Sequence, residues 1–127
     1  MTTQEATMTT REIADRFYQL SQEFNFKQIQ DELYADDAES IEPPGSDAQG
    51  LQNAKGIESI RKKGEDFDAS VEEMHGGYTG KPIVAGNFFA VTMGMDATFK
   101  GAGRMKMDEL AVYEVKDGKI VKEQFFF

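Results

Sequence analysis

The sequence predicts an α+β fold in which N-terminal helices cover one face of an antiparallel sheet. Two observations lead to this prediction. Apolar residues recur at helical spacing in the first third of the chain, and from Ile83 onward they alternate with polar residues as in strands. Helices followed by a run of strands are typical of α+β proteins. The chain has 127 residues, which suits one core, so we expect a single domain over residues 1–127.

Three helices are expected before the sheet. Thr9 and Glu12 have the spacing of a capping box, and apolar residues follow at helical spacing, so the first helix is predicted from about Thr10 to Phe24. Asn25 with Gln28 repeats the pattern and predicts a short second helix. The segment from Ala54 to Phe67 predicts a third.

The last third of the chain predicts an antiparallel meander with one apolar face. Turn residues stand at Gly86-Asn87 and Asp117-Gly118, because tight hairpin turns favour Gly, Asn and Asp. Alternate residues of the strand that starts at Phe89 share one apolar face: Phe89, Val91, Met93, Met95, Ala97 and Phe99. This face needs a cover, and the helices have to supply it.

Composition excludes several classes of protein. The formal net charge of -9 opposes binding to nucleic acid or to an anionic membrane surface. The chain has no cysteine, which removes disulfides and thiolate sites and fits a reducing compartment. One histidine cannot form a two-histidine metal site. We therefore expect a cytoplasmic protein with no metal, no cofactor, and no membrane anchor or signal peptide.

Three segments resemble the NTF2-like superfamily, and in particular its SnoaL-like polyketide cyclases and ketosteroid isomerases. They are the segment from Leu33 to Ala38, the helix start from Gly56 to Ile60, and the hairpin from Val115 to Ile120. The resemblance implies a strongly curved sheet rolled around helices into a cone. It also implies an apolar pocket that opens at one end, and a homodimer formed through the sheet.

The resemblance to ketosteroid isomerases implies three catalytic residues. Counted without gaps from the segment Ala35 to Ala38, Tyr18 falls on the family's oxyanion tyrosine, and Glu42 falls on its catalytic aspartate. Asp108 falls near its second oxyanion acid. Such sites combine a carboxylate base with a tyrosine and a protonated acid that stabilise an enolate.

The register of the last hairpin leaves two alternatives for the acid. A two-residue turn at Asp117-Gly118 places Asp108 on the face of Glu123 and Phe125, whereas a longer loop with a glycine bulge places Glu109 there. A slip of one residue therefore exchanges the carboxylate that faces inward.

Five apolar residues are predicted to line the pocket: Phe89, Val91, Met93, Met95 and Phe125. A carboxylate beside such a wall is poorly solvated, which raises its pKa toward the range of a general base. The predicted function is binding of a small apolar molecule, with isomerase or cyclase chemistry by cofactor-free proton transfer next to a carbonyl. The alternative is a non-catalytic ligand-binding or dimerisation module, in which Tyr18 is a core aromatic, Glu42 is solvated, and the apolar stripe fills a core.

Overall fold

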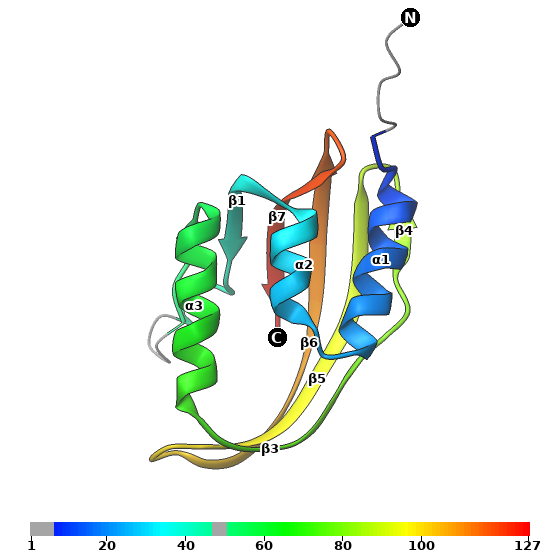
Figure 1. Cartoon of the computed structure of the whole chain (residues 1–127). Coiled ribbons are helices and arrows are strands. Elements are labelled where there is room, and N and C mark those ends of the chain that lie inside the picture. Colours follow the sequence, from blue (N-terminus) through cyan, green and yellow to red (C-terminus); the bar gives the residue numbers. More distant parts are fainter. Residues whose placement is uncertain (1–6, 47–50) are drawn as a thin grey trace, which may run out of the picture.

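The computed structural model describes residues 7–46 and 51–127. Three helices lie on one side of a curved sheet, as Figure 1 shows. They are α1 (Thr10–Gln22), α2 (Phe26–Leu33) and α3 (Ile57–Ser70). The strands are β1 (Tyr34–Ile41), β2 (Ala54–Lys55), β3 (Val71–Thr79), β4 (Ile83–Ala85), β5 (Phe88–Phe99), β6 (Gly103–Lys116) and β7 (Lys119–Phe126). The predicted α+β fold is confirmed.

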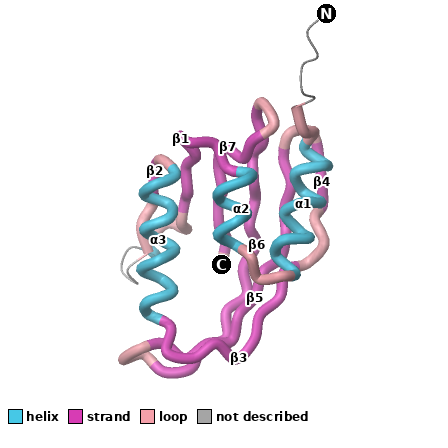
Figure 2. The backbone as a smooth tube through the Cα atoms, viewed as in Figure 1, coloured by secondary structure: helices cyan, strands magenta, loops and turns pink. Residues whose placement is uncertain are grey.

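The strands form one mixed sheet in the order β2-β1-β7-β6-β5-β3, and β4 pairs with β5 beside this path. Only the β1–β7 pair is parallel among the strands described. Figure 2 shows the sheet bending around the space in front of it, with all three helices on that concave side. We call the face toward the helices the inner face and the opposite one the outer face.

The two predicted capping boxes differ in how completely they form. Thr9 Oγ1 accepts from the Glu12 amide at 3.1 Å, and the Glu12 carboxylate accepts from the Thr9 amide at 3.0 Å. For α2, the side chain of Asn25 accepts from the Gln28 amide at 3.4 Å, which is one of the two hydrogen bonds of a capping box. The first helix ends at Gln22 rather than Phe24, because Phe24 leaves the helix with φ 55°.

An aromatic trio joins the helices to the inner face. Phe17 of α1 packs against Phe89 of β5 and Tyr113 of β6, with ring centroids 5.5 and 4.7 Å away. All three side chains are at most 2% exposed. Burying each large apolar side chain stabilises the fold by about 1.5–3 kcal/mol, so this trio is a major part of the attachment of α1 to the sheet.

One boundary departs from the expectations, and two strands come in addition to the predicted elements. Strand β1 begins at Tyr34, directly after α2. Residues Ala54–Lys55 pair with β1 rather than opening the third helix, and Gly56 (φ 88°) makes the turn into α3. Strand β3 runs through Gly76 and Gly77, which both pair with β5, and its register shifts lie between Val71 and Glu73 and between Met74 and Gly76.

The β6–β7 hairpin settles which acidic residue faces inward. Its turn is the predicted two-residue Asp117-Gly118 turn, with φ 51° and 74°. The pairing nevertheless shifts between Glu114 and Val115, so Tyr113 lies opposite Glu123. Val121 is the extra residue of this bulge, and it returns Glu123 to the face of Glu109. Of the two alternatives that the sequence left open, the pairing therefore places Glu109 rather than Asp108 on the face of Glu123.

Candidate functional site

Five polar residues from four segments of the chain gather on the inner face, and we call them the inner polar cluster. Strand β1 and the residue after it supply Ser40 and Glu42, α3 supplies Lys63, and β6 and β7 supply Glu109 and Glu123. Three carboxyl groups therefore face a single ammonium group. The cluster lies beside the apolar core rather than on a solvated surface.

Lys63 is the centre of the contacts. Its Nζ atom lies 2.5 Å from Glu42 Oε1 and donates to Ser40 Oγ at 2.7 Å. The same ammonium lies 5.5 Å from the centroid of the Phe125 ring, within range of a cation–π interaction. The Glu42 side chain is only 8% exposed, so this ion pair is shielded from water.

Glu123 is held by two hydroxyl groups. Ser40 Oγ donates to its Oε2 atom at 2.6 Å, and the Tyr34 hydroxyl donates to its Oε1 atom. Burial raises the pKa of the Glu123 carboxyl, and the two hydroxyl donors act against that rise. Burial also raises the pKa of Tyr34 well above its ordinary value, which keeps the phenol neutral.

Glu109 differs from the other two carboxyl groups because no hydrogen bond or ion pair reaches its side chain among the described residues. It lies opposite Met93 of β5, on the half-buried inner face. Burial is the largest cause that raises its pKa to about 7, followed by the negative charges of Glu42 and Glu123. Lys63 opposes this rise. Near neutral pH, Glu109 is therefore able to hold or release a proton.

The three predicted catalytic residues are not brought together. Glu42 lies in the inner polar cluster. Asp108 lies exposed on the outer face, where its carboxylate accepts from the Tyr78 hydroxyl at 2.7 Å. Tyr18 is half-buried on α1, and among the described residues no hydrogen bond joins it to Glu42. The sequence left open whether Asp108 or Glu109 faces inward, and the structure places Glu109 on the inner face.

The predicted pocket residues divide into two groups. Phe89 and Val91 are 1% exposed and belong to the filled core. Met93, Met95 and Phe125 are half-buried farther along the inner face. Strand pairing adds further methionines to this face, because Met107 lies opposite Met95 and both Met74 and Met105 lie opposite Ala97. We call these five the methionine wall: Met74, Met93, Met95, Met105 and Met107.

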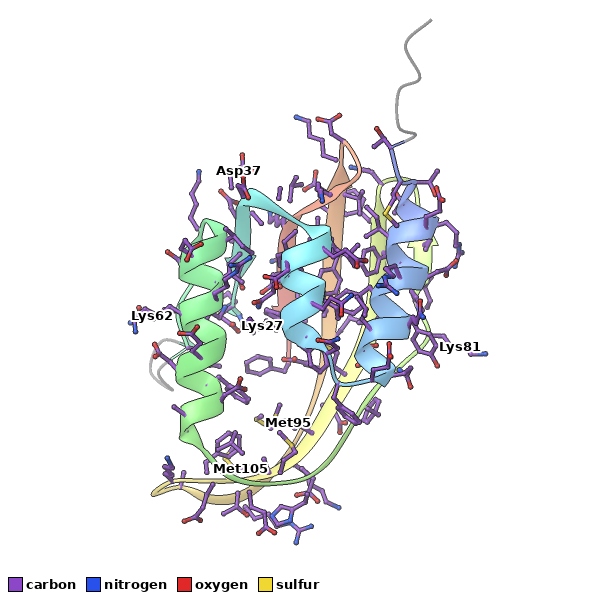
Figure 3. The ribbon with its side chains drawn as sticks, in the orientation of Figure 1. Lys27, Asp37, Lys62, Lys81, Met95 and Met105 are labelled. Carbon is purple, nitrogen blue, oxygen red and sulfur yellow. The ribbon has the colours of Figure 1, made fainter. Side chains whose placement is uncertain are left out.

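The methionine wall lies on the concave side of the sheet, and Figure 3 shows Met95 and Met105 there, near the end of α3. Met74 and Met105 are 52% and 45% exposed, which is unusual for such apolar side chains. Flexible thioether side chains of this kind adapt to irregular apolar ligands.

A shallow hollow of about 450 Å³ opens at the end of β1. Its lining is Glu42, the turn from Pro43 to Ser46, and the segment from Leu51 to Asn53. This hollow is open and its lining mixes polar and apolar groups, so it differs from the apolar pocket that the sequence predicts inside the cone, and that pocket stays a prediction.

Sequence reasoning missed Lys63, Ser40 and the role of Glu123. One signal was present for Lys63: it stands three residues after Ile60 and four before Phe67, on the apolar face of α3. A lysine in that position points its charge toward the core rather than to solvent. Ser40 carried no such signal, because a serine in a strand is common on either face.

The fold and site together describe a small α+β cone with ionisable groups inside it. The SnoaL-like domain family matches residues 8–127. A candidate SnoaL-like polyketide cyclase from Mesorhizobium loti is 33% identical and superposes with a TM-score of 0.84, over 94% of this chain and 100% of that one. The chain therefore belongs to the SnoaL-like domain family, whose fold is NTF2-like.

More distant structures show the same fold. An NTF2-like protein from Burkholderia thailandensis is 16% identical with a TM-score of 0.77, over 94% of this chain and 90% of that one. TerC, crystallised with polyporic acid, is 18% identical with a TM-score of 0.72, over 93% of this chain and 90% of that one. Among proteins of curated function, none matches the chain. In the part of the chain that the structure describes, no helix has the length and apolarity to span a membrane.

Proposed function

We propose that this protein binds a small apolar carbonyl compound and moves a proton next to the carbonyl group, as an isomerase or cyclase that needs no cofactor. The observation that carries this proposal is the inner polar cluster beside the methionine wall. Proton transfer at carbon requires a base and a group that stabilises the oxyanion, and carboxyl groups in different surroundings can supply both functions.

Glu42 is the base in this proposal. Its side chain is nearly buried, and its Oε1 atom lies 2.5 Å from Lys63 Nζ in an ion pair. It lies at the end of β1 beside the hollow, so a ligand that enters there meets this carboxylate. The role agrees with what the resemblance to ketosteroid isomerases implies for this position.

Glu109 takes the part that the resemblance assigned to Asp108. A carboxyl group whose pKa is about 7 is largely protonated in mildly acidic solution and then donates a hydrogen bond. Such a donor stabilises an enolate oxygen in an apolar site more strongly than water does. Tyr18 remains a predicted second donor, half-buried on α1.

The relatives support this chemistry in a general way. The Mesorhizobium loti protein that shares 33% of its residues is a candidate polyketide cyclase, and polyketides carry the carbonyl groups that this mechanism needs. TerC was crystallised with polyporic acid, which is a small organic acid. These two descriptions favour an oxygen-rich organic ligand for the present site.

Hydrogen–deuterium exchange next to a carbonyl tests the proposal without knowledge of the substrate. 2-Tetralone serves as an apolar ketone probe, and NMR follows its α-protons in D₂O. Wild-type protein should accelerate the exchange over buffer, and Glu42→Gln should reduce the catalysed rate about 100-fold or more. Glu39→Gln is the matched control, because Glu39 lies on the same strand and pairs with Lys55 outside the cluster.

Exchange at the buffer rate with wild-type protein, or an unchanged rate in Glu42→Gln, would contradict the catalytic proposal. A thermal shift produced by the same ketone without accelerated exchange would instead support a binding module.

A second function, a dimerisation module, is favoured by the outer face. Three large apolar side chains are exposed there or at its edge: Phe88 at 45%, Leu110 at 41% and Phe126 at 47%. Leu110 and Phe126 are direct neighbours across the β6–β7 pair. No described helix covers this face, as Figure 1 shows, so a second copy of the chain would bury it. This homodimer is compatible with the enzymatic proposal.

A further inference from the structure

Lys63 is placed differently from the other cations of the chain. Among the described lysines and arginines, it alone donates a side-chain hydrogen bond to a completely buried side chain, that of Ser40. The cations nearest to it on α3, Arg61 and Lys62, pair with acidic residues at the surface. A positive charge inside an apolar face is costly unless its contacts compensate for lost hydration.

The hydrogen-bond count of Lys63 leaves one donor for a ligand. An ammonium group has three N–H donors. Among the described residues, Ser40 and Glu42 are the acceptors within reach of Nζ, at 2.7 and 2.5 Å. The Phe125 ring flanks the ammonium at 5.5 Å and contributes an apolar wall beside it. One N–H is therefore available on a cation whose position is already fixed.

Ser40 fixes this cation from behind. Its hydroxyl donates to Glu123 and is therefore oriented with its lone pair toward Lys63, from which it accepts. Glu123 is itself anchored by the Tyr34 hydroxyl. A chain of hydrogen bonds thus runs from the buried end of β1 to the ammonium, so the charge of Lys63 is preorganised rather than mobile.

We infer that Lys63 binds the acidic oxygen of the ligand, so that the site selects apolar molecules that carry an enolic, phenolic or similarly acidic oxygen. This inference rests on the proposed function and names the substrate class for that site. An incoming oxyanion accepts from the remaining N–H of Lys63, and the Glu109 carboxyl group on the same face donates a second hydrogen bond when it is protonated. A neutral hydrocarbon gains nothing from this arrangement, whereas an enolate or phenolate gains a charge-assisted hydrogen bond.

A pair of probes that differ only at the oxygen tests the inference. 4-Nitrophenol carries an acidic oxygen whose ionisation changes its colour, and 4-nitroanisole has the same apolar body with the oxygen methylated. Absorbance titration and equilibrium dialysis give the affinity and the ionisation state of the bound probe. The proteins compared are wild type, Lys63→Met, and Lys62→Met, which removes an equal charge from a 75% exposed position on the same helix.

The expected result is preferential binding of ionised 4-nitrophenol by wild type and by Lys62→Met. In Lys63→Met, the affinity for the ionised probe should fall about tenfold or more, because a hydrogen bond to a charged group is lost. The affinity for 4-nitroanisole should remain almost unchanged. Wild-type protein offers a test that needs no variant: bound 4-nitrophenol should ionise at a lower pH than the free compound.

Two outcomes would overturn the inference. If both probes bind wild type equally well, or if the bound phenol ionises at the same or a higher pH than the free one, Lys63 is not the oxygen-binding group, while the apolar site of the proposed function stands. If neither probe binds wild type, the inference fails, and 2-tetralone exchange then decides separately whether the catalytic proposal fails with it.

Discussion

Glu109 and its neighbour Asp108 both carry a carboxyl group but occupy opposite faces of β6, and this difference sets their surroundings. Asp108 is exposed and accepts from a tyrosine hydroxyl. Glu109 lies on the half-buried inner face, where burial and the charges of Glu42 and Glu123 raise its pKa to about 7. Two carboxyl groups one residue apart therefore have different surroundings, and Glu109 is the one placed in the interior of the fold.

The raised pKa of Glu109 predicts a pH-dependent effect on stability. The folded pKa of about 7 exceeds the ordinary value of 4.5, so the folded state binds more protons between these two values. The free energy of unfolding therefore falls as the pH rises from 4.5 to 7, and the penalty is complete above pH 7. Glu109→Gln removes this penalty and should raise the free energy of unfolding at pH 8 by about 1–2 kcal/mol.

Urea denaturation at pH 5 and pH 8 checks this prediction. At pH 5, the wild type and Glu109→Gln should differ little, because folded Glu109 is then protonated. Glu72→Gln is the control for the change in net charge, since Glu72 is exposed on β3. A variant that is no more stable than wild type at pH 8 would show that Glu109 is well solvated.

At the same scale, the residues found from the sequence were those with a local signal. Glu42 was predicted by counting without a gap from the segment Ala35 to Ala38, which resembles the isomerases. Lys63 and Ser40 act through contacts with residues 21 and 83 positions away, at Glu42 and Glu123. Such contacts arise only when β1, α3 and β7 have come together, so a pattern along one chain segment cannot supply them.

At the scale of elements, the β6–β7 hairpin combines a turn that the sequence predicts with a bulge that it does not predict. The Asp117-Gly118 turn follows from the preference of these residues for positive φ, and it formed as predicted. The bulge at Val121 has no comparable signal, because an extra residue in a strand is stabilised by its neighbours on both sides. That one residue decides which acid faces the interior.

A glycine on the outer face offers a test of how β3, β5 and β6 fit together. A Cβ atom at Gly94 would collide with the Tyr78 ring and would lie 2.8 Å from Asp108 Oδ1. Gly94→Ala should therefore displace Tyr78, break its hydrogen bond to Asp108, and lower the free energy of unfolding by about 1–2 kcal/mol. Urea denaturation monitored by tyrosine fluorescence measures both effects.

Gly76→Ala on β3 is the matched control, because a Cβ atom there meets nothing within 4 Å. It should be neutral or slightly stabilising, since alanine loses less conformational freedom than glycine on folding. Equal stability of the two variants would mean that Tyr78 moves aside without cost and that its contact with Asp108 does not stabilise the sheet.

At the scale of the whole molecule, the order of elements and the apolar face of β5 were enough to predict an α+β fold with helices on one side. The alternation from Phe89 to Phe99 identified the inner face correctly. The alternation did not distinguish the residues of the filled core from those of the methionine wall. Phe89 packs against Phe17 of α1 and Val91 belongs to the same buried cluster, whereas Met93 and Met95 are only half-buried, and how much of a strand the helices cover is a property of the assembled fold.

The outer face leads to the last prediction, which concerns association of whole molecules. A stable dimer buries about 800 Å² on each partner, and the exposed apolar side chains of β5, β6 and β7 offer a patch for this. Wild-type protein should sediment as a dimer at micromolar concentration. Leu110→Glu places a charge in the middle of the patch and should yield a monomer with a free energy of unfolding close to that of a separated wild-type subunit. Gln19→Glu, an equal charge change on the exposed side of α1, should remain dimeric. Wild-type protein that sediments as a monomer throughout, or a Leu110→Glu variant that stays dimeric, would rule out this face as the interface.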